Sequence, residues 1–386
     1  MNDNQTVELS PEFLEQYSAL SFALSLLVLG LLAGAVASWA YLIVRAVRRE
    51  PILIVEPCAP RVWGLVDVMF IVITSVVCQI VFASAYVRLT GTVLPKNGEG
   101  QVPADVAAAA SLGHVAAIAL ALSWLALRFN VTPAHAGFRT QGLWRQLQIG
   151  IVTTLATLPI VYLLMAVVSI GLNTEYSHPL LDEVRRNATL GSYLLGVATA
   201  VLMAPLAEEF LFRVLIQGWL QSWPVSTPRQ ILFGASLEDR KATLDNALGR
   251  NDWDVQAELV DASPSQPSTP PLTGARDLAS LNPYAVPLTG EARDAGADIV
   301  APYVTPPDAQ AKFVPPVWPS IVTGILFGLA HWGYGLSFIP LIVLGIVLGL
   351  LYRATNSIWP CLLVHFALNG SSMLALGVSI IAERAK

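Results

Sequence analysis

The chain of 386 residues is 54% hydrophobic and only 13% charged, with a formal net charge of −5. Soluble domains carry about 25% charged residues, so this composition is typical of a membrane protein. A negative net charge without a long basic run argues against nucleic acid as a partner. Three isolated cysteines, Cys58, Cys78 and Cys361, form no CxxC pair, and they predict neither a disulfide scaffold nor a zinc knuckle.

Apolar runs close to the roughly 20 residues that cross the hydrocarbon core recur along the chain. The first is too long for a signal-peptide core and is followed by arginines, so it is predicted to stay as a membrane helix. The sequence therefore predicts an all-α, polytopic membrane helix bundle with about eight transmembrane helices. Their expected positions are about 18–45, 64–88, 105–128, 147–172, 190–220, 319–334, 337–353 and 357–382.

Arginine-rich short loops indicate which side of the membrane is cytoplasmic. Arginines cluster after the first predicted helix, within 45–61, and after the third, within 128–145. Both loops are therefore predicted to be cytoplasmic. Counting alternately places both termini outside and the long segment after the fifth helix inside. We expect a multi-pass protein of a bacterial inner membrane or a plasma membrane.

Residues 222–317 interrupt the series of apolar runs. They are rich in Pro, Ser, Thr and Asp, with seven basic and twelve acidic residues, and they contain a short Pro-Tyr-x-x-Pro repeat at 283–287 and 302–306. Such composition predicts a largely disordered, acidic, cytoplasmic insertion that can offer a docking site to a protein partner. It separates N-terminal membrane helices at 1–189 from a catalytic membrane core made of 190–221 and 318–386.

Two adjacent glutamates, Glu208 and Glu209, lie inside the apolar run 197–219. A carboxylate at membrane depth costs at least roughly 2.5 kcal/mol on insertion scales, so the pair is a functional candidate. Glu209 precedes Arg213 by four residues, the favoured order for a helical ion pair, and Arg213 is its expected structural partner. Glu208 is turned about 100° away and lacks that partner. Glu208 is therefore the candidate reactive carboxylate.

The later spans carry two histidines with companions at helical spacing. His331 follows Phe327 by four residues, and Asn369 follows His365 by four, so each pair shares one helical face. Counted from the predicted cytoplasmic helix ends, Glu208 and the two histidines all lie roughly 12 to 18 Å deep at 1.5 Å per residue. This common depth predicts that the three side chains meet on the cytoplasmic side of the bundle.

These residue types support two chemistries. A carboxylate and a histidine can deprotonate water while a second histidine and an asparagine amide donate hydrogen bonds to the oxyanion of a tetrahedral intermediate, which is peptide hydrolysis. Equally, Glu208, His331 and His365 form a zinc ligand set with an open fourth position. The sequence contains no HExxH motif, and the residues alone leave both mechanisms open.

Each polar residue also has a purely structural interpretation. Either histidine, or Asn369, can serve only to hydrogen-bond two helices, and Phe327 can serve only as core. His114 and Gln79 have no polar companions in the sequence, so we assign them to such structural roles. The glutamate pair with its arginine, combined with two histidines at matching depth, favours a functional site.

Together these residues resemble the type II CAAX prenyl endopeptidase and bacteriocin-processing (CPBP) family of intramembrane proteases. The resemblance covers about 190–220 and 319–370 and rests on three motifs in the family order. These are Glu208-Glu209-x-x-x-Arg213, Phe327-x-x-x-His331 and His365-x-x-x-Asn369.

The resemblance implies an all-helical membrane fold in which Glu208 and His331 activate water and His365 and Asn369 stabilise the oxyanion. The family is often labelled a metalloprotease, although a metal-free glutamate mechanism is proposed for it. We prefer the metal-free glutamate-histidine dyad, with zinc as the alternative cofactor. Eukaryotic relatives imply prenylated CAAX tails as substrates, and bacterial ones imply peptide maturation or bacteriocin self-immunity.

The leading hypothesis is thus an intramembrane endopeptidase that cuts a peptide or membrane-protein substrate near the cytoplasmic face of the bilayer. One alternative is a non-catalytic membrane scaffold or bacteriocin-immunity protein that binds a partner through the insertion. Another is a transporter, since intramembrane Glu and His residues can relay protons. The sequence shows no pair of matching halves with broken helices, which argues against the transporter.

Overall fold

The computed structural model describes residues 11–94, 102–172, 179–236, 239 and 312–384. The chain divides into two units, residues 1–236 with 312–386 and residues 237–311. The second unit lies outside the described residues except at position 239, and so do most of the predicted insertion and its expected partner site.

The described part of the chain is helical. One isolated bridge, between Cys58 and Phe313, is its only strand-like pairing. The helices in chain order are α1 (Pro11–Val47), α2 (Leu65–Thr90), α3 (Ala104–Phe129), α4 (Leu143–Leu172), α5 (Pro179–Arg186), α6 (Leu190–Val197), η2 (Ala198–Met203), α7 (Ala204–Glu209), η3 (Phe210–Gln217), α8 (Gly218–Ser222), η4 (Trp223–Val225), α9 (Pro228–Phe233), α12 (Trp318–Leu329), η7 (Trp332–Ser337), α13 (Phe338–Thr355) and α14 (Trp359–Arg384).

Seven helical stretches in the described ranges are long and apolar enough to cross a membrane, so the protein is a multi-pass integral membrane protein. They are Ser21–Val47, Leu65–Thr90, Ala104–Phe129, Leu143–Gly171, Leu190–Val225, Gly335–Thr355 and Trp359–Glu383. The predicted helix bundle is confirmed, with one difference at the predicted helix 319–334. Its α-helix, α12, ends at Leu329 and is followed by the 3₁₀ turns of η7, where Gly333 and Gly335, the latter at φ 73°, weaken helix formation.

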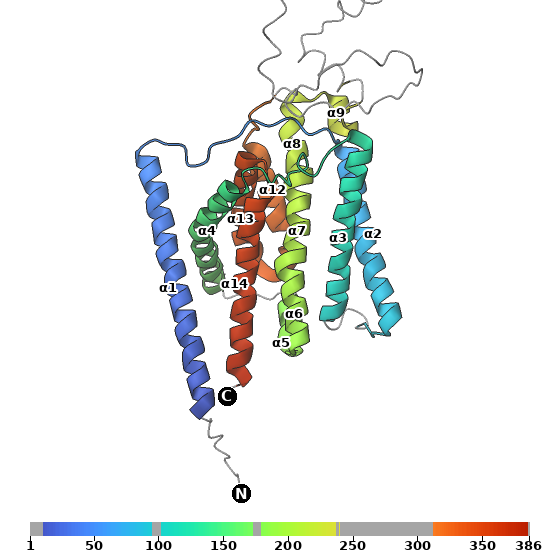
Figure 1. The fold of residues 1–386 in the computed structure, drawn as a ribbon. Coiled ribbons are helices and arrows are strands. Elements are labelled where there is room, and N and C mark those ends of the chain that lie inside the picture. Colours follow the sequence, from blue (N-terminus) through green and yellow to red (C-terminus); the bar gives the residue numbers. More distant parts are fainter. Residues whose placement is uncertain (1–10, 95–101, 173–178, 237–238, 240–311, 385–386) are drawn as a thin grey trace, which may run out of the picture. The chain divides into compact units, whose positions relative to one another are not determined.

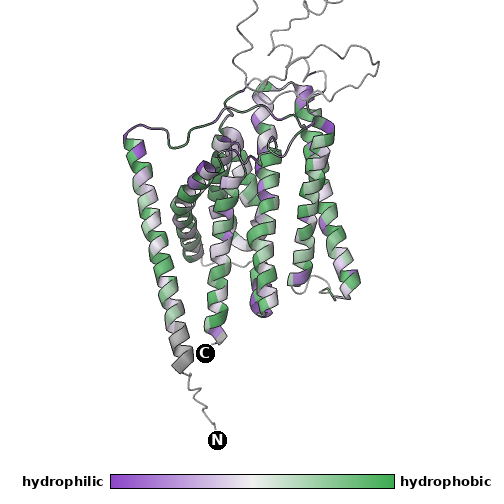
Figure 2. Cartoon of the chain, viewed as in Figure 1, coloured by the Kyte–Doolittle hydropathy of each residue, from purple (hydrophilic) through white to green (hydrophobic). Residues whose placement is uncertain are grey.

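The helix ends are ordered as the alternating topology requires. The C-terminal ends of α1, α3 and α8 lie at one end of the membrane unit, and the end of α14 lies at the other (Figure 1). Arg45 and Arg128 occupy the last turns of α1 and α3, at the first of these ends. Apolar residues cover the lengths of the helices (Figure 2), and many are exposed, as lipid contact requires. The arginines favour that first end as the cytoplasmic one.

Glycines bring α12 and α13 into close contact. On α12, Gly324 and Gly328, four residues apart, approach the α13 backbone at Ile346 and Ile342. On α13, Gly345 and Gly349, also four apart, approach the α12 backbone at Gly324 and Ser320. A Cβ atom at Gly345 would lie 2.7 Å from the Gly324 carbonyl oxygen, and one at Gly349 would lie 2.8 Å from the Ser320 carbonyl oxygen. Small residues at this spacing let helix backbones approach in a membrane. The contact fixes α12, which carries Phe327 and leads into His331.

The two flanks of the predicted insertion are folded, so its boundaries at 222–317 require correction. The amide of Ala235 donates to the Val62 carbonyl at 2.7 Å, and Phe313 pairs in both directions with Cys58 at 3.0 Å. Arg353 Nε donates to the Pro315 carbonyl at 2.7 Å. The proline-rich composition concealed these contacts because they are mostly made by the backbone, which any residue type can supply. The separate segment is residues 237–311.

Candidate functional site

The glutamates lie between two π-helical stretches of one continuous helix, residues 190–222, here called the glutamate helix. The amide of Ala204 bonds to Thr199 and that of Gly218 bonds to Arg213, both five residues back. Pro205 cannot donate to the carbonyl four residues before it, which disrupts regular α-helical bonding there. π-Helical turns are rare and recur at functional sites.

The wider turns keep a set of polar residues on one face. Positions four apart on a regular α-helix drift by about 40° around the axis, and extra residues per turn reduce that drift. Glu209, Arg213 and Gln217 follow one another at this spacing, and all three are fully buried. The sequence motif named only the first two, and Gln217 was missed. The pattern that could have revealed Gln217 is its position four residues after Arg213, the same spacing that separates Arg213 from Glu209.

Glu209 forms a buried ion pair with Arg213 and also contacts a histidine. Glu209 Oε2 accepts a hydrogen bond from Arg213 Nε at 3.0 Å, as the spacing predicted. Its second oxygen, Oε1, lies 2.9 Å from His365 Nδ1. Because a carboxylate can only accept, His365 carries a proton on Nδ1. Glu209 therefore sets the orientation of His365, a role that the sequence did not reveal because the two residues are 156 positions apart.

A ladder of hydrogen bonds that passes through Thr323 on α12 holds the arginine. Arg213 Nη1 donates to Thr323 Oγ1 at 3.3 Å, and Thr323 donates in turn to the Gln217 side-chain oxygen at 3.3 Å or to the Pro319 carbonyl at 2.8 Å. Gln217 Nε2 donates to the Gly349 carbonyl at 2.7 Å. Buried polar groups cost free energy unless they are hydrogen-bonded, so these contacts allow the charged pair to persist between helices.

Phe327 packs between the charged pair and both histidines. Its ring is fully buried, lies edge-on to His365 with 5.5 Å between ring centres, and is tilted against His331 at 5.1 Å. The Arg213 guanidinium lies 5.5 Å from the centre of the same ring. Edge-to-face and cation–π contacts have specific geometry, so Phe327 restricts where the three polar groups can lie. The motif Phe327-x-x-x-His331 thus contacts the motif Glu208-Glu209-x-x-x-Arg213 directly.

Glu208 faces both histidines. Its Oε2 atom lies 3.7 Å from His365 Nε2 and 4.0 Å from His331 Nε2. The Glu208 side chain keeps 29% of its surface exposed, whereas Glu209 keeps none, so only Glu208 can reach a bound molecule. His331 lies just beyond α12, and its Nδ1 is 2.9 Å from the Phe327 carbonyl oxygen. The structure brings together the three side chains that the sequence placed at one depth.

The protonation of the two histidines determines which hydrogen bonds these three groups can form. In each histidine, Nδ1 lies beside an oxygen that accepts a hydrogen bond, so the proton of a neutral imidazole is on Nδ1. The Nε2 atom of that neutral ring is then an acceptor, and an ionised Glu208 is also an acceptor. In that state Glu208 Oε2 and His365 Nε2, 3.7 Å apart, are both acceptors. Glu208 Oε2 is buried and has no hydrogen-bond partner within the described part of the protein. A water molecule, a substrate N–H group or a proton held by one of the three would satisfy this arrangement.

Asn369 lies one helical turn beyond His365, but its observed contact is with the glutamate helix. Its side-chain amide donates to the Ala200 carbonyl at 2.8 Å, within the π-helical stretch η2. A widened helix exposes carbonyls that regular bonding would occupy, and the asparagine satisfies one of them. An asparagine amide has a second N–H, so this bond leaves one donor for other partners.

The sequence suggested Glu208, His331 and His365 as possible zinc ligands. Zinc ligands surround the ion at about 2.0–2.2 Å. No group of three His, Cys, Asp or Glu side chains among the described residues is arranged to hold a metal ion. The described residues thus offer no preformed set of three zinc ligands.

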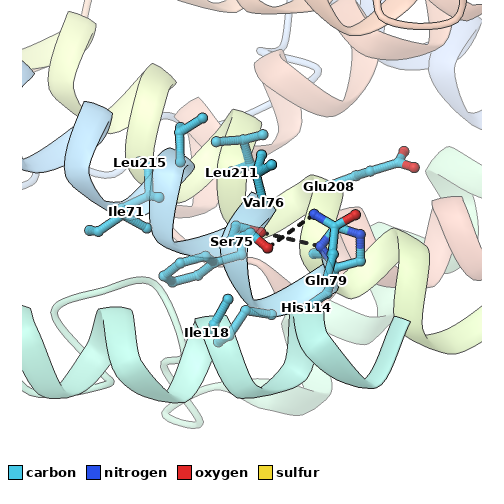
Figure 3. A pocket seen from close by; sticks show the side chains of 13 residues that line it. Ile71, Ser75, Val76, Gln79, His114, Ile118, Glu208, Leu211 and Leu215 are labelled. Atoms are coloured by element: carbon cyan, nitrogen blue, oxygen red, sulfur yellow. Dashed lines mark hydrogen bonds between the residues drawn. The ribbon is translucent and has the colours of Figure 1, made fainter. Parts of the chain in front are cut away.

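A cavity of about 130 Å³ adjoins Glu208 between α2, α3 and the glutamate helix. Ser75, Gln79 and His114 gather on one side of it, and the Glu208 carboxylate points away from them (Figure 3). That carboxylate is the one that lies near His331 and His365. Ser75 Oγ lies 3.3 Å from His114 Nδ1. His114 and Gln79 therefore have the polar companion that the sequence pattern did not reveal.

Comparison with known proteins supports the family resemblance over part of the chain. Residues 304–371 match the family model described as type II CAAX prenyl endopeptidase Rce1-like. The match contains the motifs of Phe327–His331 and His365–Asn369, whereas Glu208 and Glu209 precede it. No curated protein and no solved structure matches the chain. Over residues 304–371 the chain is thus similar to that family.

Proposed function

We propose that this protein is an intramembrane endopeptidase that hydrolyses a peptide bond near the cytoplasmic face of the membrane, with Glu208 as the general base. The position of the Glu208 carboxylate, 4.0 Å from His331 Nε2 and 3.7 Å from His365 Nε2, carries the proposal. A water molecule bound between Glu208 and His331 donates a hydrogen bond to each, which directs an oxygen lone pair towards the carbon of a bound peptide carbonyl. The family match supports the same reaction class.

The reaction follows from these positions. The water oxygen bonds to the carbonyl carbon as one of its protons passes to Glu208, and a tetrahedral oxyanion forms. Glu208 then returns the proton to the amide nitrogen as the carbon–nitrogen bond breaks, which releases an amine and a carboxylic acid. Glu208 thus carries the proton from the water to the leaving nitrogen, and no further reactant is required.

His365 and Asn369 are the proposed oxyanion donors. To donate through Nε2 while Nδ1 donates to Glu209, His365 carries a proton on each ring nitrogen in this proposal. The second amide N–H of Asn369, one turn further along α14, joins it. Arg213 and Phe327 act as positioning residues, because each holds Glu209 or the histidines in place.

The test is a cleavage assay on purified full-length protein with fluorogenic peptides that end in a CAAX-like sequence. Glu208→Gln and His331→Ala should each lower kcat/KM by about 10²-fold or more, the usual contribution of a positioned acid or base. Glu383→Gln, at an exposed ion pair with Arg185, is the matched control and should keep full activity. Unchanged cleavage in both site variants would sink the assignment. A folded wild-type protein that cuts none of the peptides would favour the non-catalytic scaffold.

A further inference from the structure

We propose that the cavity between α2, α3 and the glutamate helix is a substrate subsite that holds one apolar side chain next to the scissile bond. In this proposal His114 hydrogen-bonds the substrate backbone at the polar side of the cavity. The inference rests on the proposed function, because it assigns a substrate to the same Glu208. It concerns α2 and α3, which carry none of the three motifs.

The walls and size of the cavity define what it accepts. Most of the lining is aliphatic, as Figure 3 shows at Ile71, Val76, Ile118, Leu211 and Leu215. An apolar cavity of about 150 Å³ is known to bind benzene. The 130 Å³ here therefore suits one leucine or phenylalanine side chain, and a long acyl or isoprenoid chain exceeds it.

The cavity adjoins the proposed catalytic site because Glu208 borders both. The stem of Glu208 lines the cavity while its carboxylate faces His365 and His331. Ser75 lies ten residues into α2, roughly 15 Å from its start at 1.5 Å per residue, and Glu208 lies at nearly the same depth below Trp219. A side chain in the cavity would thus leave its backbone beside the reactive carboxylate.

The polar side of the cavity supplies what an extended peptide needs. Backbone N–H and C=O groups at membrane depth must find hydrogen-bond partners. Gly113 lets α3 approach α2 closely, since a Cβ atom there would lie 2.7 Å from the Cys78 carbonyl oxygen. This brings His114 to Ser75. A serine hydroxyl that donates to Nδ1 leaves the histidine proton on Nε2, where it can bind a peptide carbonyl.

The size limit is tested with paired substitutions on α2. Val76 lines the cavity and Val77 does not, yet the two are 49% and 51% exposed, so phenylalanine is equally tolerable for the fold at either position. The assay uses three peptides with Ala, Leu or Phe beside the scissile bond, varied on each side in turn. Val76→Phe should lower kcat/KM for the Leu and Phe peptides about 10-fold or more and leave the Ala peptide within about 2-fold. Val77→Phe should leave all three within about 2-fold.

The polar contact is tested with His114→Leu and Ser75→Ala. The proposed hydrogen bond from His114 to the substrate is equally strong in the ground state and the transition state. His114→Leu should therefore raise KM about 10-fold and leave kcat unchanged. If His114 only links α2 to α3, both variants would lower the unfolding temperature alike and neither would change KM, and the assignment of His114 would fail.

The outcomes separate this proposal from the proposed function. Cleavage of the Ala peptide by wild type, lost in Glu208→Gln, establishes the catalytic assignment by itself. With that result in hand, a Val76→Phe variant that affects all three peptides equally, or none, overturns the subsite. If the wild type cuts no peptide, or Glu208→Gln still cuts, the proposed function fails and the subsite falls with it.

Discussion

Glu209 carries two roles that a double-mutant experiment can separate. Arg213 Nε and His365 Nδ1 both donate to its carboxylate, at 3.0 and 2.9 Å, and Glu209 and Arg213 are fully buried. A glutamine offers one acceptor oxygen, so in Glu209→Gln one of the two donors must face an NH₂ group. Loss of the ion pair with Arg213 should reduce stability, and loss of the contact with His365 should also reduce activity.

The magnitude follows from the burial of the pair. Removing one partner of a buried, hydrogen-bonded ion pair costs about 3–5 kcal/mol, because the other charge stays buried without compensation. Glu209→Gln should therefore be strongly destabilised. Adding Arg213→Met removes the orphaned charge, so the double variant should be more stable than Glu209→Gln, with a coupling energy of about 1–3 kcal/mol.

Activity should respond differently from stability. In serine proteases, replacing the carboxylate behind the catalytic histidine by an amide costs about 10⁴-fold in kcat. Glu209→Gln should lose at least about 10²-fold, and the double variant should stay inactive because His365 still lacks its carboxylate. Stability is measured by thermal unfolding in detergent and activity by peptide cleavage at a temperature where all variants are folded. If the two substitutions destabilised the protein additively, a stabilising ion pair between Glu209 and Arg213 would be refuted. If the double variant recovered activity, the role of Glu209 in orienting His365 would be refuted.

Three further outcomes follow from the fold. Ala235 and Phe313 pair with Val62 and Cys58, which are at most roughly 14 Å apart along the chain, so replacing 237–311 by a short Gly/Ser linker should preserve folding and cleavage. Deleting 222–317 should instead lower the unfolding temperature sharply; equal behaviour of the two deletions would contradict the folded flanks. Gly345→Ala should cost about 1–3 kcal/mol by forcing α12 and α13 apart, whereas Gly30→Ala, with no atom within 4 Å, should be neutral or stabilising. Cleavage should persist with a chelator, and elemental analysis of the active protein should find no stoichiometric zinc; a tight stoichiometric ion would restore the metal mechanism.

The sequence was sufficient for the helical membrane fold. Long apolar runs can cross a bilayer only as helices or closed barrels, because hydrocarbon offers no partner for backbone groups, and length then separates the two. The same rule made Glu208, Glu209 and Arg213 conspicuous. Helical spacing correctly paired Glu209 with Arg213, since residues four apart on a helix are neighbours whatever else surrounds them.

Boundaries were less predictable than the existence of the helices. The end of α12 at Leu329 depends on how η7 packs, and the ordered flanks of the insertion depend on backbone hydrogen bonds to distant residues. Hydropathy and composition report side chains, so neither contact left a clear signal in the pattern.

Contacts between helices were decided only by the tertiary structure. The bond from Glu209 to His365, the ladder from Arg213 through Thr323 to Gln217, and the joining of Ser75 to His114 each link residues on different helices. Spacing within one helix determines which face a residue occupies, but the partner of that face depends on how helices cross, and here glycines and π-helical turns set the crossing. The residue types and their depth were therefore determined by the sequence alone, and their convergence on Glu208 was determined by packing.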